Sequence, residues 1–147
     1  MKMKRCRICN ANITKTFVNL GNMPLANAFL KKNIVHKEPM LPLHAYVCSQ
    51  CFLVQLEKIE EPKNIFLDYA YFSSYSKTWL KHSKDYVDKK MKKFGLDSKS
   101  LVIEIASNDG YLLQFFKKFR VPVLGIEPAV NVAKIAQEKE IPTITKF

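Results

Sequence analysis

The segment from residue 101 to residue 128 constrains the fold of this chain more than any other part of the sequence. Residues 101–106 and 121–126 are short apolar runs rich in branched side chains, which is typical of parallel strands buried on both faces. Between them, apolar residues recur on one face of a predicted helix, at positions 112, 115, 116 and 119. This order predicts a β-α-β unit, whose first turn binds nucleotides beside the helix N-terminus.

The loop after the first of these strands has the composition of a cofactor-binding turn. It runs from Glu104 to Gly110, and since Gly110 is its only glycine, the Gly-x-Gly-x-x-Gly spacing is absent. The loop aligns instead with Glu-x-Gly-x-Gly-x-Gly, the loop of S-adenosylmethionine methyltransferases, with Ala106 and Asn108 in the places of the first two glycines. Alanine is small and asparagine tolerates a left-handed backbone, so both replacements are physically reasonable. An ordinary surface turn is the alternative interpretation.

A second carboxylate follows at the end of the next strand. Glu127 comes 17 residues after Gly110, a spacing that suits a carboxylate accepting hydrogen bonds from two ribose hydroxyls. Pro128 suits the first turn of a further helix, expected to end near residue 139, and residues 141–145 begin a third strand. Residues 99–147 are therefore expected to form the first half of a Rossmann-like domain.

The four cysteines form two Cys-x-x-Cys pairs, Cys6 with Cys9 and Cys48 with Cys51. Two such pairs supply the four thiolates of a closed tetrahedral zinc site. The 38 residues between the pairs exceed the usual spacing of a zinc ribbon, so ordered structure is expected between them. Two disulfides or free thiols are the alternatives, but disulfides require an oxidising compartment and no secretory signal is evident. His44 is a candidate substitute ligand, although a solvated loop position is the favoured interpretation.

Composition and charge lead us to expect a soluble, cytoplasmic protein without a membrane partner. The 147 residues are 48% hydrophobic, enough for one domain or two small ones, and no apolar run reaches the length of a membrane helix. The formal net charge of +11 would attract nucleic acid, but the lysines are scattered along the whole chain. We therefore favour solvated lysine-rich faces over a nucleic-acid site, and an anionic substrate would also gain from this field.

The chain is expected to have three parts and an α/β fold. Residues 1–61 would form a small zinc-binding module, residues 62–98 an aromatic segment with a linking helix, and residues 99–147 the start of the cofactor-binding domain. The strands of the first part are expected near residues 17–21, 41–47 and 52–56.

The linking helix is predicted from about residue 76 to residue 94, and Gly95 suits its end. Its apolar face is expected to consist of Leu80, Val87, Met91 and Phe94.

In their order and spacing, these motifs resemble the N-terminal part of the zinc-containing, S-adenosylmethionine-dependent sugar C-methyltransferases. These enzymes methylate a carbon of a nucleotide-linked keto-sugar in deoxysugar and surface-glycan biosynthesis. The resemblance runs along nearly all 147 residues, although Asn10 and Glu140 stand where the family usually has glycine. The segments that carry it are residues 6–9, 20–27, 42–43, 48–51, 53–56, 69–76, 82, 104–110, 125–128 and 141–143.

The resemblance implies roles for residues at matching positions. A structural Zn²⁺ would be held by Cys6, Cys9, Cys48 and Cys51. The S-adenosylmethionine site would consist of Glu104, Ala106, Asn108, Asp109, Gly110, Glu127 and Pro128. Tyr71 matches an active-site tyrosine that can hydrogen-bond the sugar oxygens or the enolate, and Tyr75 is expected to line the same cleft. Core packing of both tyrosines is the alternative.

In the implied reaction, a base removes the acidic proton beside the keto group, and the enolate carbon attacks the methyl group of the cofactor. The principal catalytic histidine of the family lies downstream of the position of Phe147. A doubly wound sheet also has more than the three strands expected here. We therefore expect a truncated chain that folds its zinc module, binds the cofactor weakly or not at all and has no turnover of its own. A second polypeptide is a candidate source of the remaining half.

Two other classes of function stay open. A zinc-ribbon module that binds RNA or DNA would agree with the basic charge, and it predicts affinity that falls steeply with salt. It leaves the loop from Glu104 to Gly110 and the carboxylate of Glu127 unexplained. A non-catalytic interaction fragment would keep the zinc module for contacting a partner and would lose cofactor binding.

Overall fold

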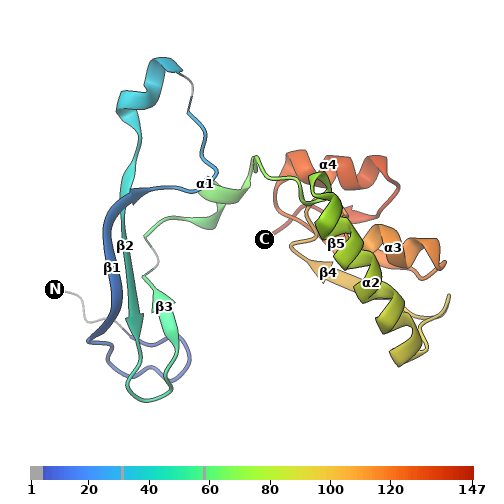
Figure 1. Ribbon diagram of the computed structural model, residues 1–147. Coiled ribbons are helices and arrows are strands. Elements are labelled where there is room, and N and C mark those ends of the chain that lie inside the picture. Colours follow the sequence, from blue (N-terminus) through green and yellow to red (C-terminus); the bar gives the residue numbers. More distant parts are fainter. Residues whose placement is uncertain (1–4, 31, 58) are drawn as a thin grey trace. The chain divides into compact units, whose positions relative to one another are not determined.

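The computed structural model describes residues 5–30, 32–57 and 59–147, without the side chains of residues 34–36. The chain forms two compact units, Met1–Glu61 and Pro62–Phe147 (Figure 1). Residues 62–98, expected as a separate part, belong to the same compact unit as residues 99–147. Within the described ranges, none of the helices combines the length and the apolar character that a bilayer crossing requires.

The first unit is built on a three-stranded antiparallel sheet in the order β1-β2-β3. Its strands are β1 (Lys15–Pro24), β2 (Met40–Val47) and β3 (Val54–Leu56), and a short 3-10 helix, η1 (Lys32–Lys37), lies between β1 and β2. Strand β1 is longer than expected because irregularities in its pairing with β2 absorb extra residues, and the pairing then resumes. One irregularity lies between Asn19 and Asn22, where Gly21 has a φ of 71°.

The buried core of the first unit is small. It consists of Cys6, Ile13, Tyr46 and Cys48, with Ala11 and Leu53 packed against it. A core of this size gives little hydrophobic stabilisation, and domains in this position usually depend on a metal or on disulfides. The four cysteines could supply this stabilisation by binding a metal ion.

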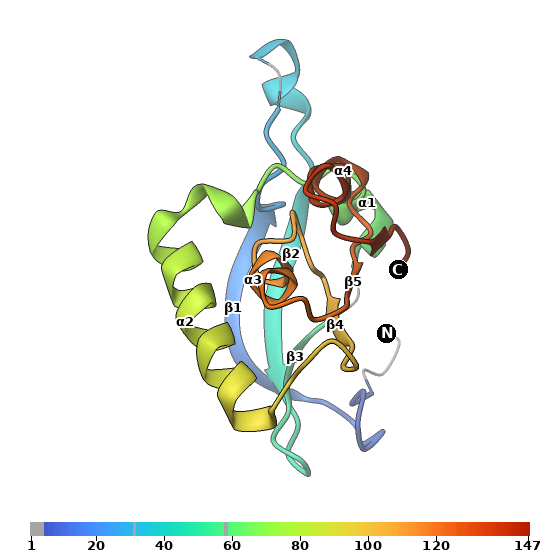
Figure 2. The same cartoon turned by 90° about the vertical axis from the view of Figure 1, so that its right-hand side faces the viewer.

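The second unit contains a three-stranded parallel sheet in the order β4-β5-β6. Its strands are β4 (Val102–Ile105), β5 (Val123–Ile126) and β6 (Thr143–Ile144), joined by the helices α3 (Leu113–Lys118) and α4 (Val130–Glu138). The β-α-β unit and the α/β fold class expected from the sequence are confirmed. The elements that precede this sheet are α1 (Pro62–Phe66), the 3-10 helix η2 (Ser73–Tyr75) and α2 (Lys77–Phe94), as Figure 2 shows from a second side.

Helix α2 begins and ends as its sequence predicts. The Ser76 hydroxyl accepts a hydrogen bond from the Trp79 amide at 3.1 Å, and Gly95 takes a left-handed φ of 59° and bonds back to the Met91 carbonyl. Val87 is fully buried in the core of the second unit. The prediction for Phe94 was wrong, because this side chain is 61% exposed.

The Gly95 turn explains the error at Phe94. After the turn, the Leu96 amide donates to the Met91 carbonyl at 3.3 Å, and the Leu96 side chain packs against the core. Leu96 therefore takes the core position expected for Phe94, as in a Schellman motif. The Phe94 ring instead lies beneath the ammonium groups of Lys90 and Lys93, each 5.6 Å from its centroid.

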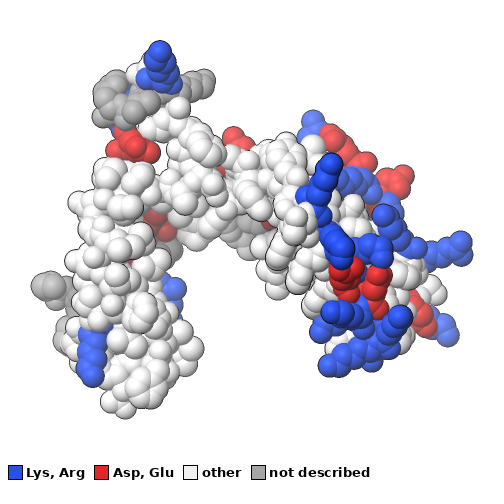
Figure 3. Space-filling view, in the orientation of Figure 1, with Lys and Arg blue, Asp and Glu red and all other residues white. Residues whose placement is uncertain are grey.

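Basic residues are interspersed with acidic ones on the face of the second unit that Figure 3 displays. On α2, Lys81 pairs with Asp85 at 2.8 Å and Lys84 pairs with Asp88 at 2.6 Å. Such spacing is typical of a solvated helix face. Because α2 has seven lysines and two aspartates, the helix keeps a net positive charge although Lys81 and Lys84 are paired.

Candidate functional site

Each Cys-x-x-Cys pair is a tight loop with the same backbone hydrogen bonds. The Cys6 amide donates to the Ala11 carbonyl at 2.9 Å, and the Asn10 amide donates back to the Cys6 carbonyl at 3.0 Å. In the second pair, Cys48 and Phe52 make the equivalent bonds, with Leu53 in the place of Ala11, at 3.0 Å each. The loops close through a left-handed residue after the second cysteine.

The left-handed residues are Asn10, with a φ of 57°, and Phe52, with a φ of 59°. The sequence indicated the first, because asparagine tolerates this conformation. Nothing in the sequence indicated the second, since a bulky aromatic residue rarely adopts positive φ. In this conformation the Phe52 amide donates to the Cys48 carbonyl and closes the second loop.

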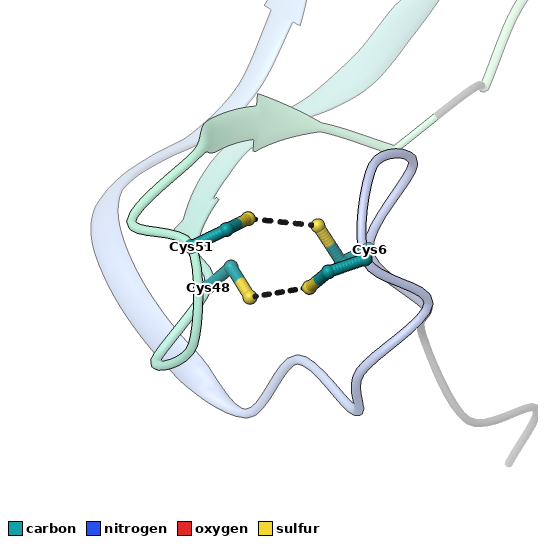
Figure 4. A group of neighbouring side chains, drawn as sticks. Cys6, Cys48 and Cys51 are labelled. Atoms are coloured by element: carbon teal, nitrogen blue, oxygen red, sulfur yellow. Dashed lines mark hydrogen bonds between the residues drawn. The ribbon is translucent and has the colours of Figure 1, made fainter.

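The four cysteine sulfurs converge on one point (Figure 4). They lie within 4.8 Å of one another, and Cys6–Cys51 and Cys9–Cys48 are each 3.5 Å apart. A tetrahedron with Zn–S bonds of about 2.3 Å has sulfur–sulfur edges of about 3.8 Å. All four cysteines are free thiols, and two of them are buried. The number, type and spacing of the donors therefore fit Zn²⁺.

The Cys6 and Cys51 thiols have different pKa values because their surroundings differ. The backbone N–H of Cys9 and the Gln55 side-chain amide lower the pKa of the Cys6 thiol to about 6. At Cys51, the backbone N–H of Leu53 acts to lower the pKa, but the neighbouring Cys6 sulfur and burial raise it to about 12. Four thiolates so close together repel one another unless a cation lies between them. A divalent metal would supply that cation.

His44 is not placed as a ligand. It lies on β2 rather than in a solvated loop, so that interpretation of the sequence was wrong. Its Nε2 lies 2.8 Å from the Thr16 hydroxyl, its Nδ1 lies 2.9 Å from the Tyr46 hydroxyl, and its ring stacks on Tyr46. Both ring nitrogens therefore have partners within the sheet.

In the second unit, the loop after β4 adopts the conformation of a glycine-rich turn. Its left-handed residues are Ala106 (φ 59°), Asn108 (φ 49°) and Gly110 (φ 74°). These are the three positions at which the methyltransferase pattern has glycine. A Cβ at Gly110 would collide with Ile141, and one at Gly125 on β5 would collide with Ser107. The backbone geometry of a cofactor loop is thus kept although two of its glycines are replaced.

Two buried carboxylates accept hydrogen bonds from backbone amides of this loop and of the segments next to it. Glu127, which is 6% exposed, accepts the Asn108 amide at 2.8 Å and the Ala129 amide at 2.9 Å. Asp109, which is 1% exposed, accepts the Ser74 amide at 3.3 Å. Since each carboxylate oxygen has two lone pairs, Glu127 keeps acceptor capacity for ligand hydroxyls.

Three buried polar atoms of the described residues have no hydrogen-bond partner: Glu104 Oε2, Ser107 Oγ and Asp109 Oδ1. Burial raises the pKa of Glu104 to about 7. A hydrogen bond from Tyr111 acts to lower this pKa, while the charges of Asp109 and Glu127 raise it further. Burial and the nearby Glu104 raise the pKa of Tyr111 to about 12. Unsatisfied buried acceptors beside several carboxylates fit a ligand that brings N–H donors or positive charge.

A second segment is tied to the loop by side-chain amides. We call residues 69–75 the aromatic strap. Asn108 accepts the Ser73 amide at 2.9 Å and donates to the Tyr71 carbonyl at 3.0 Å. Asn131 on α4 accepts the Tyr69 amide at 3.0 Å and donates to the Tyr69 carbonyl at 2.9 Å. The two bonds of Asn108 hold the aromatic strap against the loop, and the two bonds of Asn131 hold it against α4.

Lys139 adds a charged tie between the same elements. Its ammonium lies 2.8 Å from the Asp109 carbonyl, 3.4 Å from Asp109 Oδ2 and 3.0 Å from the Ser74 hydroxyl. The roles of Asn131 and Lys139 could not be predicted from sequence patterns. The partner of Asn131 is 62 residues away along the chain, and those of Lys139 are 30 or more residues away.

The loop and the aromatic strap border a cavity of about 500 Å³. Of the predicted site residues, the lining includes Tyr71, Ala106, Asn108, Glu127 and Pro128. Glu104, Asp109 and Gly110 do not line it but support residues that do. The lining residues that sequence reasoning did not assign to the site include Phe66, Tyr69, Ser73, Ile105, Tyr111 and Ile126.

The two predicted catalytic tyrosines have different positions. Tyr71 lies at the cavity and is 50% exposed. The expectation that Tyr75 lines the same cleft is not met, because its side chain is 81% exposed and stacks on Phe72, with ring centroids 5.3 Å apart. The short helix η2 turns the chain at this point and directs Tyr75 away from the cavity.

Two comparisons with known proteins indicate what this chain resembles. Residues 6–66 match the model of a family described as "Putative zinc binding domain". The chain is also 32% identical, over 140 residues, to the C-methyltransferase NovU of Streptomyces niveus. The alignment covers 95% of this chain and 33% of NovU, so the chain spans about a third of the length of this relative. The resemblance to a C-methyltransferase is thereby confirmed.

Proposed function

We propose that the cavity of the second unit binds S-adenosylmethionine, and that the chain is the cofactor-binding and zinc-binding part of a C-methyltransferase for a nucleotide-linked keto-sugar. The observation that carries this proposal is the loop after β4, which is left-handed at Ala106, Asn108 and Gly110 and lies above buried carboxylates with unused acceptor atoms. The similarity to a C-methyltransferase supports the reaction class.

The residues present fit the cofactor chemically. The remaining lone pairs of Glu127 would accept the ribose hydroxyls. Glu104 and Asp109 lie behind the lining of the cavity, and their negative charge would attract the cationic amino acid part of the cofactor. When bound, the cofactor supplies an electrophilic methyl group. The apolar walls of the cavity, such as Ile105 and Ile126, would exclude water from it.

Tyr71 is the described residue best placed to act on the second substrate. Its carbonyl is fixed by Asn108, and its side chain lies at the cavity. We propose that its phenol donates a hydrogen bond to the sugar oxygen on which negative charge develops after proton removal. The family resemblance assigns the principal base to a histidine beyond Phe147, so the described residues would bind and orient the substrates.

The cysteine cluster is proposed as a structural zinc site. Its four thiols occupy all positions of a tetrahedral metal, so no position is left for a substrate or an activated water. Zinc would stabilise the small core of the first unit and take no part in methyl transfer.

Calorimetric titration with S-adenosylhomocysteine tests the central proposal, because this demethylated form of the cofactor has no methyl group to transfer. We expect saturable binding that is lost in Glu127→Ala and kept in Lys134→Ala, an exposed change on α4. Equal binding by the two variants, or no binding to the parent protein, would contradict the proposed cofactor site.

A further inference from the structure

A second, smaller hollow lies between α2 and the residues that follow the cofactor loop. Its volume is about 150 Å³. We call it the aromatic hollow, and its lining consists of Trp79, His82, Ser83, Tyr86, Tyr111 and Leu112.

The rings of the aromatic hollow are arranged as a stack open to solvent. The His82 ring lies nearly parallel to Trp79, at 14° and 5.2 Å between centroids, and the Tyr111 ring is tilted against Trp79 at 6.0 Å. Trp79 is 42% exposed and Tyr86 is 43% exposed, so these rings are not core residues. The Ser83 hydroxyl donates a hydrogen bond to the Trp79 carbonyl at 2.9 Å. The hollow is therefore lined mainly by flat aromatic rings, several of which also carry a polar ring nitrogen or a hydroxyl.

Tyr111 connects the aromatic hollow to the large cavity. It lines both, and its hydroxyl is hydrogen-bonded to Glu104, which holds the ring in place between them. In the proposed reaction, the attacking carbon must come within about 3–3.5 Å of the methyl carbon, so the sugar ring belongs at the large cavity. A hollow on the other side of Tyr111 suits a more distant part of the same substrate molecule.

The chemistry of the hollow and its surroundings fits a nucleotide. Planar heteroaromatic bases stack on exposed aromatic side chains without needing specific hydrogen bonds. The same helix carries Lys77, Lys81, Lys84, Lys89 and Lys90, and the ammonium of Lys90 lies 5.0 Å from the centre of the Tyr86 ring. A diphosphate linked to the base would be attracted by this charge.

We propose that the aromatic hollow binds the base of the nucleoside diphosphate that carries the sugar. This inference rests on the proposed function, since it assigns one part of the substrate of that same site. In this proposal Trp79, His82 and Tyr86 bind the substrate. If these side chains served only the packing of α2, they would not contact it.

Trp79 makes the proposal directly measurable, because it is the only tryptophan of the chain. Thymidine diphosphate and uridine diphosphate would be titrated while Trp79 fluorescence is recorded. Pyrophosphate and ribose 5-phosphate serve as probes that carry the charge without the base. We expect saturable quenching by the two nucleotides and none by the other two compounds.

Two variants on α2 separate stacking in the hollow from general effects of the helix. Tyr86→Ala removes one wall, and we expect it to weaken the nucleotide affinity at least tenfold. Phe94→Ala removes an exposed aromatic ring of the same helix that does not line the hollow, and we expect no change. Circular dichroism confirms that both variants are folded.

The outcomes are distinct from those of the cofactor experiment. No quenching, equal quenching by pyrophosphate, or equal weakening by Tyr86→Ala and Phe94→Ala would overturn the nucleobase site. If S-adenosylhomocysteine binds and the nucleotides do not, the inference fails and the proposed cofactor site stands. If the nucleotides quench Trp79 and S-adenosylhomocysteine does not bind, the cofactor proposal fails and the nucleobase site stands.

Discussion

The side-chain amide of Asn108 donates a hydrogen bond to the carbonyl oxygen of Tyr71 at 3.0 Å. This bond joins a residue of the cofactor loop to the aromatic strap across 37 positions of sequence. Asparagine thus does two things at a position where the methyltransferase pattern has glycine. It adopts the left-handed backbone, and its side chain fixes Tyr71 at the cavity.

Replacing Asn108 separates these two effects. Asn108→Gly keeps the left-handed backbone and loses the bonds to Tyr71 and Ser73, so we expect S-adenosylhomocysteine affinity to fall by roughly tenfold. Because the buried Ser73 amide loses its partner, we also expect the free energy of unfolding to fall by about 1–3 kcal/mol. Asn108→Ala loses the bonds and also strains the backbone, at a cost of about 1–2 kcal/mol. Calorimetry and urea unfolding measure the two quantities. Equal stability of the two variants would show that the backbone conformation does not matter.

Gly110→Ala tests the close packing beneath the loop. A Cβ there would collide with Ile141, which is 1% exposed and cannot move into solvent. Gly95→Ala is the matched control, because Gly95 has a similar positive φ and nothing within 4 Å of its Cβ position. We expect about 1–2 kcal/mol of destabilisation at Gly95 from backbone strain, and about 1–3 kcal/mol more at Gly110 from overpacking. Equal losses in chemical denaturation would contradict the packing argument.

Glu104 predicts a pH dependence of stability. Its pKa is raised from 4.5 in the unfolded chain to about 7 in the folded one, so the folded state favours the neutral acid. The contribution of Glu104 is therefore fully present below pH 4.5 and is lost as the pH rises through about 7. We expect Glu104→Gln to flatten the decline of the unfolding free energy over this range. A parallel decline in the variant and in the parent protein would assign it to other groups.

Metal removal is expected to act on the first unit alone. Purified protein should contain one zinc ion per chain, and a chelator should abolish the amide-exchange protection of β2 and β3, because the small core cannot hold this unit without the metal. The protection of α2 and β5 serves as the internal control and should persist. Cys9→Ser and Cys51→Ser should reproduce the effect. Full protection of β2 in metal-free protein would contradict a structural role of zinc.

The sequence predicted the elements of this chain better than their contacts. The paired Cys-x-x-Cys motifs indicated a common site, and the apolar runs indicated β4 and β5, because both patterns are local. Phe52 and Phe94 show where local patterns fail. Positive φ at a phenylalanine follows from loop closure, and the exposure of Phe94 follows from Leu96 taking its place in the core.

For the loop after β4, the sequence predicted the turn but not the side-chain contacts that hold it. The tolerance of Asn108 for a left-handed backbone could be inferred from its residue type. Its bonds to the aromatic strap, and those of Asn131 to Tyr69, join residues 35 to 62 positions apart. Such pairs leave no periodic trace in a single sequence. Of the two tyrosines that the resemblance placed at the cavity, Tyr71 lines it and Tyr75 does not.

The most direct measurement of the central claim is the map of backbone amide chemical shifts on addition of S-adenosylmethionine to the zinc-loaded chain. We predict saturable shifts at residues 106–110, at Glu127 and Ala129, and in the aromatic strap. The amides of the two cysteine loops should not move, since zinc has a structural role in this account. Absence of saturable shifts around Asn108 and Glu127, or shifts centred on the cysteine loops, would contradict the proposed cofactor site.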